Sequence, residues 1–267
     1  MASAHTPRSI LITGGGSGIG RATAELFSSR GWRVGLADVN AAALAETVAT
    51  LPPERTETYV MDVRDRAAWA RVLAEFTAPA GGRLDVLFNN AGVPQGGPFA
   101  AISDEEFDRV VAINFTGVAN GARAAHPYLA RTPGSCLLNT ASASAIYGTA
   151  GLATYSATKF AVRALTEALD AEWAADGIKV RDLMPGFIDT PLLAQVLPGT
   201  NRTARESVVE AGLEFTPVAA VAEAAWDAVH GGPLHAYIGK TARRLAFGAR
   251  WMPGRLRRMM RARVLGG

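Results

Sequence analysis

The chain has 267 residues, of which 49% are hydrophobic and 19% charged, and a net charge of +3. This length suits one doubly wound α/β domain, which buries enough surface to fold without disulfides, and the single cysteine excludes an internal one. No stretch approaches about 18 uncharged apolar residues, and no apolar run precedes the first predicted strand, so we expect neither a transmembrane helix nor a secretory signal but a cytoplasmic protein.

Short apolar runs alternate with helical patterns along the chain. This alternation is typical of a parallel sheet with helices on both faces, and we predict one doubly wound α/β domain over residues 1–239 with a seven-stranded parallel sheet. Strands are predicted at 9–13, 32–37, 57–61, 84–88, 134–140, 178–184 and 236–239. Helices are predicted at 18–29, 41–50, 65–78, 103–130, 153–175 and 217–230.

The first predicted strand runs into a glycine-rich turn, residues 14–20, at the start of a helix. Glycines allow a tight turn and close backbone approach, and the helix N-terminus offers free N–H groups to a pyrophosphate. Asp38 ends the second strand about 20 residues later, where an acidic residue binds ribose hydroxyls and repels a 2′-phosphate. No basic residue follows Asp38 directly, and Ser17 precedes Gly18, so the pattern favours NAD over NADP. Alternatively, Asp38 caps the helix that begins near Asn40.

Tyr155 and Lys159 are four residues apart in a helical pattern, so their side chains share one face. We expect the ammonium to lower the phenol pKa by roughly 1–3 units. Such a tyrosine can take a proton from an alcohol or give one to a developing alkoxide. The alternative, a solvated lysine one turn from a surface tyrosine, is weakened by the cofactor loop.

With these residues together, the chain resembles the short-chain dehydrogenase/reductase family over about residues 8–190, and the resemblance implies a Rossmann fold. Its motifs are Thr13-Gly14-x-x-x-Gly18-x-Gly20, Asp62-Val63, Asn89-Asn90-Ala91-Gly92, Asn114, Ser142 thirteen residues before Tyr155, the Tyr155-x-x-x-Lys159 pair, and Pro185-Gly186 with Thr190. One departure is Arg181-Asp182, where the family often has Asn-Ala, a change that bears on the cofactor-side or subunit contacts of that strand.

The resemblance implies a catalytic group of Asn114, Ser142, Tyr155 and Lys159. Tyr155 would be the general acid/base, and Lys159 would lower its pKa and hold ribose hydroxyls. Ser142 would hydrogen-bond the substrate oxygen, and Asn114 would position a water that links Lys159 to solvent. Ser142, Ser144 and Tyr155 are the implied substrate contacts. The implied cofactor contacts are Gly14, Ser17, Gly18, Ile19, Gly20, Asp38, Asp62, Val63, Asn90, Ala91, Gly92, Tyr155, Lys159, Pro185, Gly186, Ile188 and Thr190.

Residues 186–215 interrupt the regular alternation. We predict a substrate-binding loop with a short helix that closes over the site. Its apolar residues favour a hydrophobic alcohol or ketone over a sugar. They are Phe187, Ile188, Leu192, Leu193, Val196 and Leu197.

Residues 240–267 form a basic, partly amphipathic tail with nine basic and no acidic residues, so the rest of the chain carries a net −6. Such a tail can pack on its own body or on a neighbouring subunit, which we favour, or contact an anionic membrane surface weakly. Nucleic acid is not expected, because no recognition motif accompanies the charge. The resemblance implies a homodimer or homotetramer through the helices at 103–130 and 153–175.

These patterns predict an NAD-dependent oxidoreductase acting on a hydrophobic secondary alcohol or ketone. The alternatives are an NADP-linked carbonyl reductase and a non-catalytic nucleotide-binding regulatory protein on the same fold. No metal is expected, because the four histidines lack metal-ligand spacing. Cys136 lies in an apolar run and is expected to be buried packing.

Overall fold

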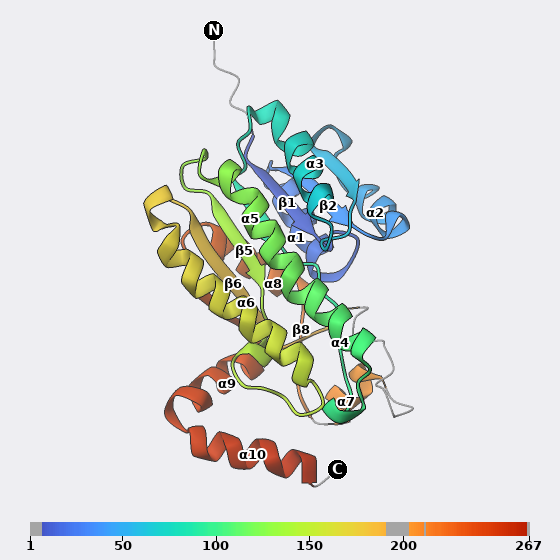
Figure 1. Ribbon diagram of the computed structural model, residues 1–267, viewed down its shortest axis with the longest axis vertical. Coiled ribbons are helices and arrows are strands. Elements are labelled where there is room, and N and C mark those ends of the chain that lie inside the picture. Colours follow the sequence, from blue (N-terminus) through green and yellow to red (C-terminus); the bar gives the residue numbers. More distant parts are fainter. Residues whose placement is uncertain (1–6, 191–202, 211, 266–267) are drawn as a thin grey trace.

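The computed structural model describes residues 7–190, 203–210 and 212–265. Its centre is a parallel sheet of seven strands in the order β3-β2-β1-β4-β5-β6-β9 (Figure 1). The predicted sheet is confirmed, with boundaries that differ by no more than two residues. The strands are β1 (Ser9–Thr13), β2 (Arg33–Asp38), β3 (Thr56–Val60), β4 (Val86–Asn89), β5 (Cys136–Thr140), β6 (Lys179–Pro185) and β9 (His235–Ile238).

Helices cover both faces of the sheet because successive strand side chains point to opposite sides. Ile10 and Ile12 of β1 belong to one apolar core, whereas Leu11 belongs to the other. The first core is closed by α1 (Gly18–Ser29), α2 (Ala41–Val48) and α8 (Val218–Val229). The second is closed by α3 (Arg66–Thr77), α5 (Gly117–Leu129) and α6 (Ala153–Glu172). This is the predicted doubly wound arrangement.

The predicted helix at 103–130 is wrong in one respect, because it is not continuous. It begins as α4 (Asp104–Val111), where the Ser103 side chain accepts a hydrogen bond from the Glu106 N–H at 3.3 Å. A π-helical turn, Ala112–Thr116, then separates α4 from α5. The wider turn carries Asn114, whose side chain is fully buried. Such turns occur frequently at functional sites.

Two short strands outside the main sheet, β7 (Phe187–Ile188) and β8 (Phe215–Thr216), pair in parallel. Between them lies α7 (Ala204–Glu210), the short helix expected in this segment. Arg205 of α7 forms an ion pair with Asp189, which ties the helix to the chain after β7. The other apolar residues expected here, Leu192, Leu193, Val196 and Leu197, lie outside the described residues.

The basic tail is largely helical. It forms α9 (Gly239–Trp251) and α10 (Pro253–Leu265), and α10 projects away from the sheet (Figure 1). The inner face of α9 packs on the body through the buried Ala242, whereas α10 buries Leu256 (4% exposed) beside Gly248 of α9. Within the described part of the chain, no helix has the length and apolarity needed to span a membrane.

Cys136 lies in β5, between β4 and β6, and is fully buried. Burial raises the pKa of its thiol to about 12. This agrees with the expected packing role, since a neutral buried thiol behaves as a small apolar side chain.

Candidate active site

The carboxyl ends of β1, β4 and β5 are joined by side-chain hydrogen bonds at one edge of the sheet. The Thr13 hydroxyl accepts from the N–H groups of Asn90 and Ala91 at 3.0 and 3.1 Å. The Asn90 amide donates to the Thr13 carbonyl at 3.1 Å and accepts from the Thr140 hydroxyl at 3.1 Å. Ligands of parallel α/β sheets bind at this edge, where the strand order changes direction.

The glycine loop has a shape that other residues could not adopt. Gly14 and Gly18 have φ values of +66° and +51°. A Cβ on Gly20 would lie 2.1 Å from the Gly14 carbonyl oxygen, so the helix and turn meet backbone to backbone. Ser17 is the N-cap of α1 but makes no capping hydrogen bond with its side chain. The bare helix N-terminus and close approach fit a dinucleotide pyrophosphate.

Asp38 is fixed beside this loop. Its Oδ2 accepts from the Gly16 N–H at 3.1 Å, and its Oδ1 accepts from the Asn40 N–H at 3.0 Å. The N-cap of α2 is Asn40 itself, whose Oδ1 accepts from the Ala43 N–H at 3.1 Å. The capping alternative for Asp38 is therefore wrong, and its carboxylate lies beside the glycine loop. Ile19 of the loop packs against the core on the α1 side.

The segment after β6 returns to the glycine loop. Pro185 ends β6, and the N–H of Gly186 donates to a carbonyl of β9 at 3.2 Å. Ile188 is buried in β7. A Cβ on Gly18 would lie 3.2 Å from the methyl group of Thr190, so these two residues are neighbours. The structure thus brings this predicted cofactor segment against the predicted phosphate loop.

Asp62 and Val63 follow β3. The Asp62 carboxylate pairs with Arg64 at 2.6 Å, and that hydrogen bond holds the pKa of Asp62 below its usual value. Val63 is buried, and its carbonyl accepts from the Trp69 indole N–H at 2.9 Å. Both residues lie at the same edge of the sheet as Asp38, because β2 and β3 are paired and parallel.

Tyr155, Ser142 and Lys159 converge from α6 and from the end of β5. Ser142 lies close enough to Tyr155 to lower the pKa of its phenol, and the Ser142 Oγ accepts from the Ser144 N–H at 3.1 Å, which fixes the turn after β5. The Lys159 Nζ donates to the Thr140 carbonyl at 2.8 Å and lies 5.7 Å from the centre of the Tyr155 ring. The predicted group is therefore assembled.

The predicted direction of the Tyr155 pKa shift is wrong for the protein alone. Burial raises the pKa of the phenol, and the nearby Ser142 hydroxyl opposes this only in part. The Lys159 ammonium donates its hydrogen bond to the Thr140 carbonyl. The same burial lowers the pKa of Lys159 to about 8, since removing an ammonium from water disfavours its charge.

Asn114 and Gly92 form the base of this group. The Asn114 Oδ1 accepts from the Val93 N–H at 2.8 Å, and its Nδ2 donates to the Val93 carbonyl at 2.9 Å. A Cβ on Gly92 would lie 3.3 Å from that Oδ1 and 3.5 Å from the Lys159 Nζ. Asn114 of the π turn thus holds the loop after β4 beside Lys159. A larger side chain at position 92 would push Asn114 and Lys159 apart.

Gln95 contacts the candidate site, although no sequence pattern singles it out. It is 3% exposed, and its Oε1 accepts from the N–H of Tyr155 at 3.3 Å, so it anchors the start of α6. Its buried Nε2 has no hydrogen-bond partner among the described residues. The contact joins the loop after β4 to the first turn of α6, 60 residues further along the chain, which leaves no local sequence signal.

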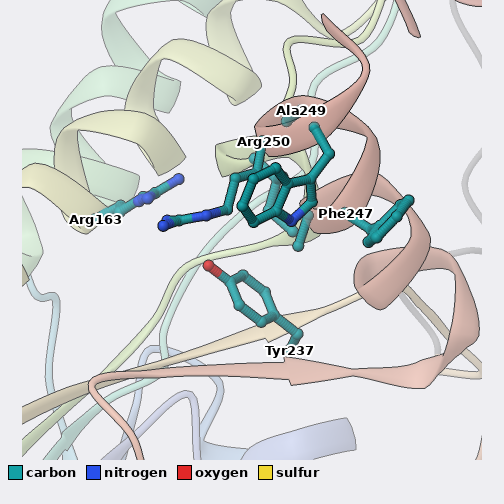
Figure 2. Close-up of a pocket in the computed structure, with 8 residues that line it drawn as sticks. Arg163, Tyr237, Phe247, Ala249 and Arg250 are labelled. Atoms are coloured by element: carbon teal, nitrogen blue, oxygen red, sulfur yellow. The ribbon is translucent and has the colours of Figure 1, made fainter.

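A separate hollow of about 540 Å³ lies between α6, β9 and α9. Figure 2 shows the side chains of Arg163 and Arg250 reaching toward each other, with the Tyr237 hydroxyl directed to the same space. Its lining contains no member of the Ser142–Tyr155–Lys159 group. This hollow is therefore distinct from the candidate active site.

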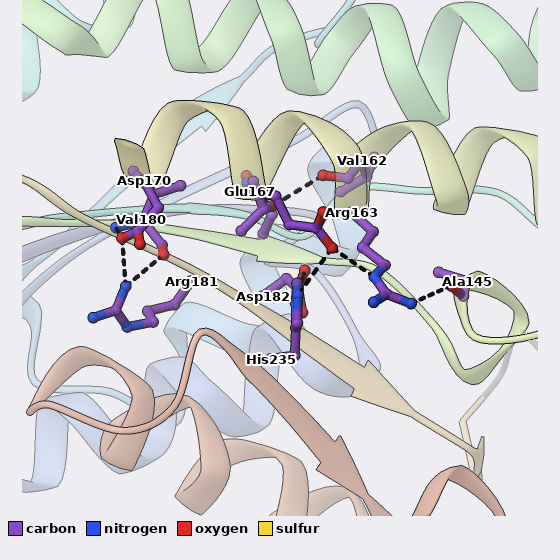
Figure 3. Close-up of polar contacts among 11 residues, drawn as sticks. Ala145, Val162, Arg163, Glu167, Asp170, Val180, Arg181, Asp182 and His235 are labelled. Atoms are coloured by element: carbon purple, nitrogen blue, oxygen red, sulfur yellow. Dashed lines mark hydrogen bonds and ion pairs between the residues drawn. The ribbon is translucent and has the colours of Figure 1, made fainter. Parts of the chain in front are cut away.

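Arg181 and Asp182 tie β6 to its neighbours within the chain. Arg181 pairs with Asp170 of α6 at 2.6 Å. Asp182 is fully buried, and its Oδ2 lies 3.0 Å from the Nδ1 of His235, whose Nε2 lies 3.1 Å from Glu167 (Figure 3). Burial raises the pKa of Asp182, which the His235 contact opposes.

The same network continues to the turn that follows Ser142. Glu167 accepts from the Nε of Arg163 at 2.8 Å, and a terminal nitrogen of Arg163 donates to the Ala145 carbonyl at 3.2 Å (Figure 3). A buried carboxylate on β6 is thereby linked through α6 to the turn Ala143–Ala145. No cluster of His, Cys, Asp or Glu that could hold a metal ion occurs among the described residues.

The buried Lys159 predicts a pH-dependent stability. Below pH about 8 the folded and unfolded chains both carry the Lys159 proton, whereas between about 8 and 10.5 only the unfolded chain does. Stability therefore rises with pH across that window. Chemical denaturation should show wild type gaining about 3 kcal/mol relative to Lys159→Met between pH 7 and 10.5. The control is Lys240→Met, because the Lys240 ammonium is exposed in the wild type. An equal gain of wild type relative to Lys240→Met over the same pH range would show that burial of Lys159 is not the cause.

The doubly wound sheet, the glycine loop and the assembled tyrosine–lysine pair together define a Rossmann-fold oxidoreductase. The sequence matches the short chain dehydrogenase family over residues 8–201. The protein belongs to this family, whose members bind nicotinamide cofactors.

Three known proteins illustrate the similarity. A 2,5-dichloro-2,5-cyclohexadiene-1,4-diol dehydrogenase of Sphingobium indicum is 34% identical, over 74% of this chain and 80% of its own. A meso-2,3-butanediol dehydrogenase of Serratia marcescens is 37% identical, over 68% and 71%. The solved structure of a short-chain dehydrogenase from Streptomyces avermitilis has a TM-score of 0.81 and 29% identity, with 98% of each chain covered.

Solved relatives have been captured with either nicotinamide cofactor. A Burkholderia phymatum protein in complex with NAD has a TM-score of 0.80 and 26% identity, with 95% of each chain covered. A Burkholderia cenocepacia protein in complex with NADP has a TM-score of 0.79 and 25% identity, covering 95% of this chain and 97% of its own. The family alone therefore leaves the choice of cofactor to the residues of each chain.

Proposed function

We propose that the protein transfers a hydride between NAD(H) and a hydrophobic secondary alcohol or ketone. The observation that carries the proposal is the convergence of Ser142, Tyr155, Lys159 and Asn114 at the sheet edge that also holds the glycine loop. A tyrosine beside a serine hydroxyl and a buried lysine suits proton transfer to a substrate oxygen.

In this proposal the bound cofactor supplies the hydride acceptor or donor. Ser142 holds the substrate oxygen by a hydrogen bond, and Tyr155 exchanges the proton with that oxygen. The loss of a hydride from carbon and a proton from oxygen converts an alcohol to a ketone, and the reverse steps restore it. Lys159 keeps a positive charge near the phenol, and Asn114 holds the loop that borders both. Gln95 fixes the helix start from which Tyr155 projects.

The ionisation of Tyr155 bears on direction. Its raised pKa keeps the phenol protonated at neutral pH, the form that donates to a carbonyl oxygen. Lys159, with a pKa of about 8, is mostly charged under the same conditions. The protein alone is thus poised for the reductive step, whereas oxidation requires the phenolate and gains from alkaline pH.

The choice of NAD rests on Asp38. Its carboxylate contacts the Gly16 N–H at 3.1 Å, and the next residues, Val39 and Asn40, offer no cation for a 2′-phosphate. A fixed anion there repels that phosphate. We expect Asp38→Ala to raise kcat/KM with NADP(H) about tenfold and to lower it with NAD(H). Steady-state rates with both cofactors measure this; an unchanged ratio in the variant would refute the assigned role.

An apolar substrate is supported by the segment after β6. Phe187 is half-buried two residues beyond Pro185, whereas Ile188 packs into the core on the α1 side of the sheet. The names of two relatives specify the dehydrogenation of a diol, one a chlorinated cyclohexadiene diol and the other butanediol. They support an alcohol as the substrate that this protein oxidises.

The function is tested by following NADH absorbance with a panel of steroids, aryl ketones and long-chain alcohols. NAD(H) and NADP(H) are assayed in parallel. Turnover with NAD(H) supports the proposal, and turnover with NADP(H) alone overturns the cofactor assignment. Binding of NADH without turnover on any member of the panel favours the regulatory alternative or a different substrate class.

The link from Asp182 to Ala145 makes Arg163 a positioning residue for Ser142. Removing its guanidinium in Arg163→Met frees the turn Ala143–Ala145, and we expect kcat to fall about tenfold, the value of one charged hydrogen bond. KM for NADH should stay within about twofold, because the glycine loop is untouched. Arg163→Lys should restore part of kcat.

The matched control is Arg21→Met, since Arg21 makes the same i,i+4 contact with Glu25 on an exposed helix face. Steady-state kinetics and thermal unfolding are measured on all three variants. An equal loss of kcat in Arg21→Met, or a loss that follows stability alone, would exclude positioning through Arg163.

A further inference from the structure

The outer face of α9 alternates cations with exposed aromatic rings. Its members recur every three or four residues and therefore share one side of the helix. Phe247 and Trp251 are 57% and 64% exposed. The exposed face comprises Arg243, Arg244, Phe247, Arg250 and Trp251. Two such rings one turn apart form a contiguous apolar patch, and exposed apolar patches rimmed by polar residues mark interaction surfaces.

The following helix, α10, extends the same character. Its exposed side chains include Arg255, Arg257, Arg258, Arg261 and Met259. Within the part of the chain that the structure describes, none of these arginines forms an ion pair, and the sequence from 240 onward contains no carboxylate side chain. Because α10 projects from the body, its own subunit does not neutralise this charge (Figure 1).

The hollow beside α9 adds a recessed cationic site. Arg163 and Arg250 face each other across about 540 Å³, and the Tyr237 hydroxyl adds a donor (Figure 2). No acidic residue belongs to its lining, although Glu167 engages Arg163 on one side. Phosphate oxygens fit such a site, because arginine offers several N–H donors in one plane. Phe247 and Trp251 also line it, so the phosphate would lie next to apolar surface.

We propose that α9 and α10 form a docking surface for an anionic lipid bilayer, with the hollow between Arg163 and Arg250 receiving a headgroup phosphate. Interfacial helices combine basic residues with Trp, Phe and Met in this way, the rings entering the headgroup region while arginines meet phosphates. A bilayer supplies phosphates without a fixed register, so arginines spread over two helices can all reach one. Residues 1–239 carry a net charge of −6 and are repelled by the same bilayer, so we expect contact only through α9 and α10.

The test is co-sedimentation of the full chain with phosphatidylcholine vesicles that contain or lack phosphatidylglycerol. We expect binding only with the anionic lipid, and its loss at high salt. Replacing two arginines in Arg257→Gln/Arg258→Gln should weaken binding about 30-fold, since each basic residue near an anionic surface contributes about fivefold. The matched control, Arg21→Gln/Arg71→Gln on α1 and α3, should leave it within twofold of wild type.

A second readout reports the ring contact. The other four tryptophans are buried or half-buried, so quenching by brominated lipid is expected to come from Trp251 and to disappear in Trp251→Phe. Absence of binding to anionic vesicles at low salt would overturn the proposal, as would equal loss in the control pair. Arginine-dependent self-association without vesicle binding would assign the surface to a second copy instead.

Discussion

Tyr155→Phe is expected to reduce turnover about a thousandfold or more, because it deletes the only proposed group that exchanges a proton with the substrate oxygen. NADH should still bind within about threefold of wild type, since the glycine loop and Asp38 do not touch the phenol oxygen. The ring stays, so the packing of α6 is retained. Steady-state kinetics together with a fluorescence titration of NADH separate the two effects.

Tyr128→Phe is the control for this change, because Tyr128 lies on α5 and packs against the sheet core rather than the site. It should leave turnover within twofold of wild type. Retention of more than about a tenth of the turnover by Tyr155→Phe would remove Tyr155 from the proton-transfer step, since acid–base groups contribute at least a hundredfold.

Gly20→Ala is expected to weaken NADH binding about a hundredfold, through a contact that side-chain motion cannot relieve. The new Cβ would lie 2.1 Å from the Gly14 carbonyl oxygen and 3.0 Å from the Asn90 amide. Both neighbours are tied to the strand ends, so the turn must open, at a cost typical of overpacking, about 1–3 kcal/mol. A titration with NADH and a thermal scan distinguish a distorted loop from a protein that no longer folds.

Gly148→Ala supplies the comparison for that experiment. Its Cβ would meet nothing within 4 Å, and its φ is not positive, so binding and stability should be unchanged. Tight NADH binding by Gly20→Ala would mean that the dinucleotide does not lie on the glycine loop as proposed.

The sheet could be predicted because a buried strand leaves an apolar run between turns, as β1, β2, β4 and β5 do. The edge strand β3 shows instead half-buried residues that alternate with exposed ones. The break at Ala112–Thr116 could not, because a π turn adds one residue without changing the helical periodicity around it. The tail was predicted as basic and amphipathic, yet its division into α9 and α10 depends on where α9 leaves the body after Trp251.

The parts of the site that depend on spacing were predictable, as Gly14, Asp38, Asn90 and Lys159 illustrate. The pKa of Tyr155 was not, because it depends on burial and on the carbonyl that holds the lysine. Gln95 and the Asp182–His235 contact also escaped prediction. Each joins segments more than fifty residues apart, and such pairs leave no trace in a local pattern.

The buried thiol of Cys136 in β5 reports how often the middle of the sheet opens. A reagent that alkylates thiolates cannot reach Cys136, or find it ionised, until β4 and β6 separate from it. The labelling rate therefore measures the opening of the strands around Cys136, and no cysteine has to be engineered for it. The same chemistry would rank the stability of every purified variant named above, before any substrate is known.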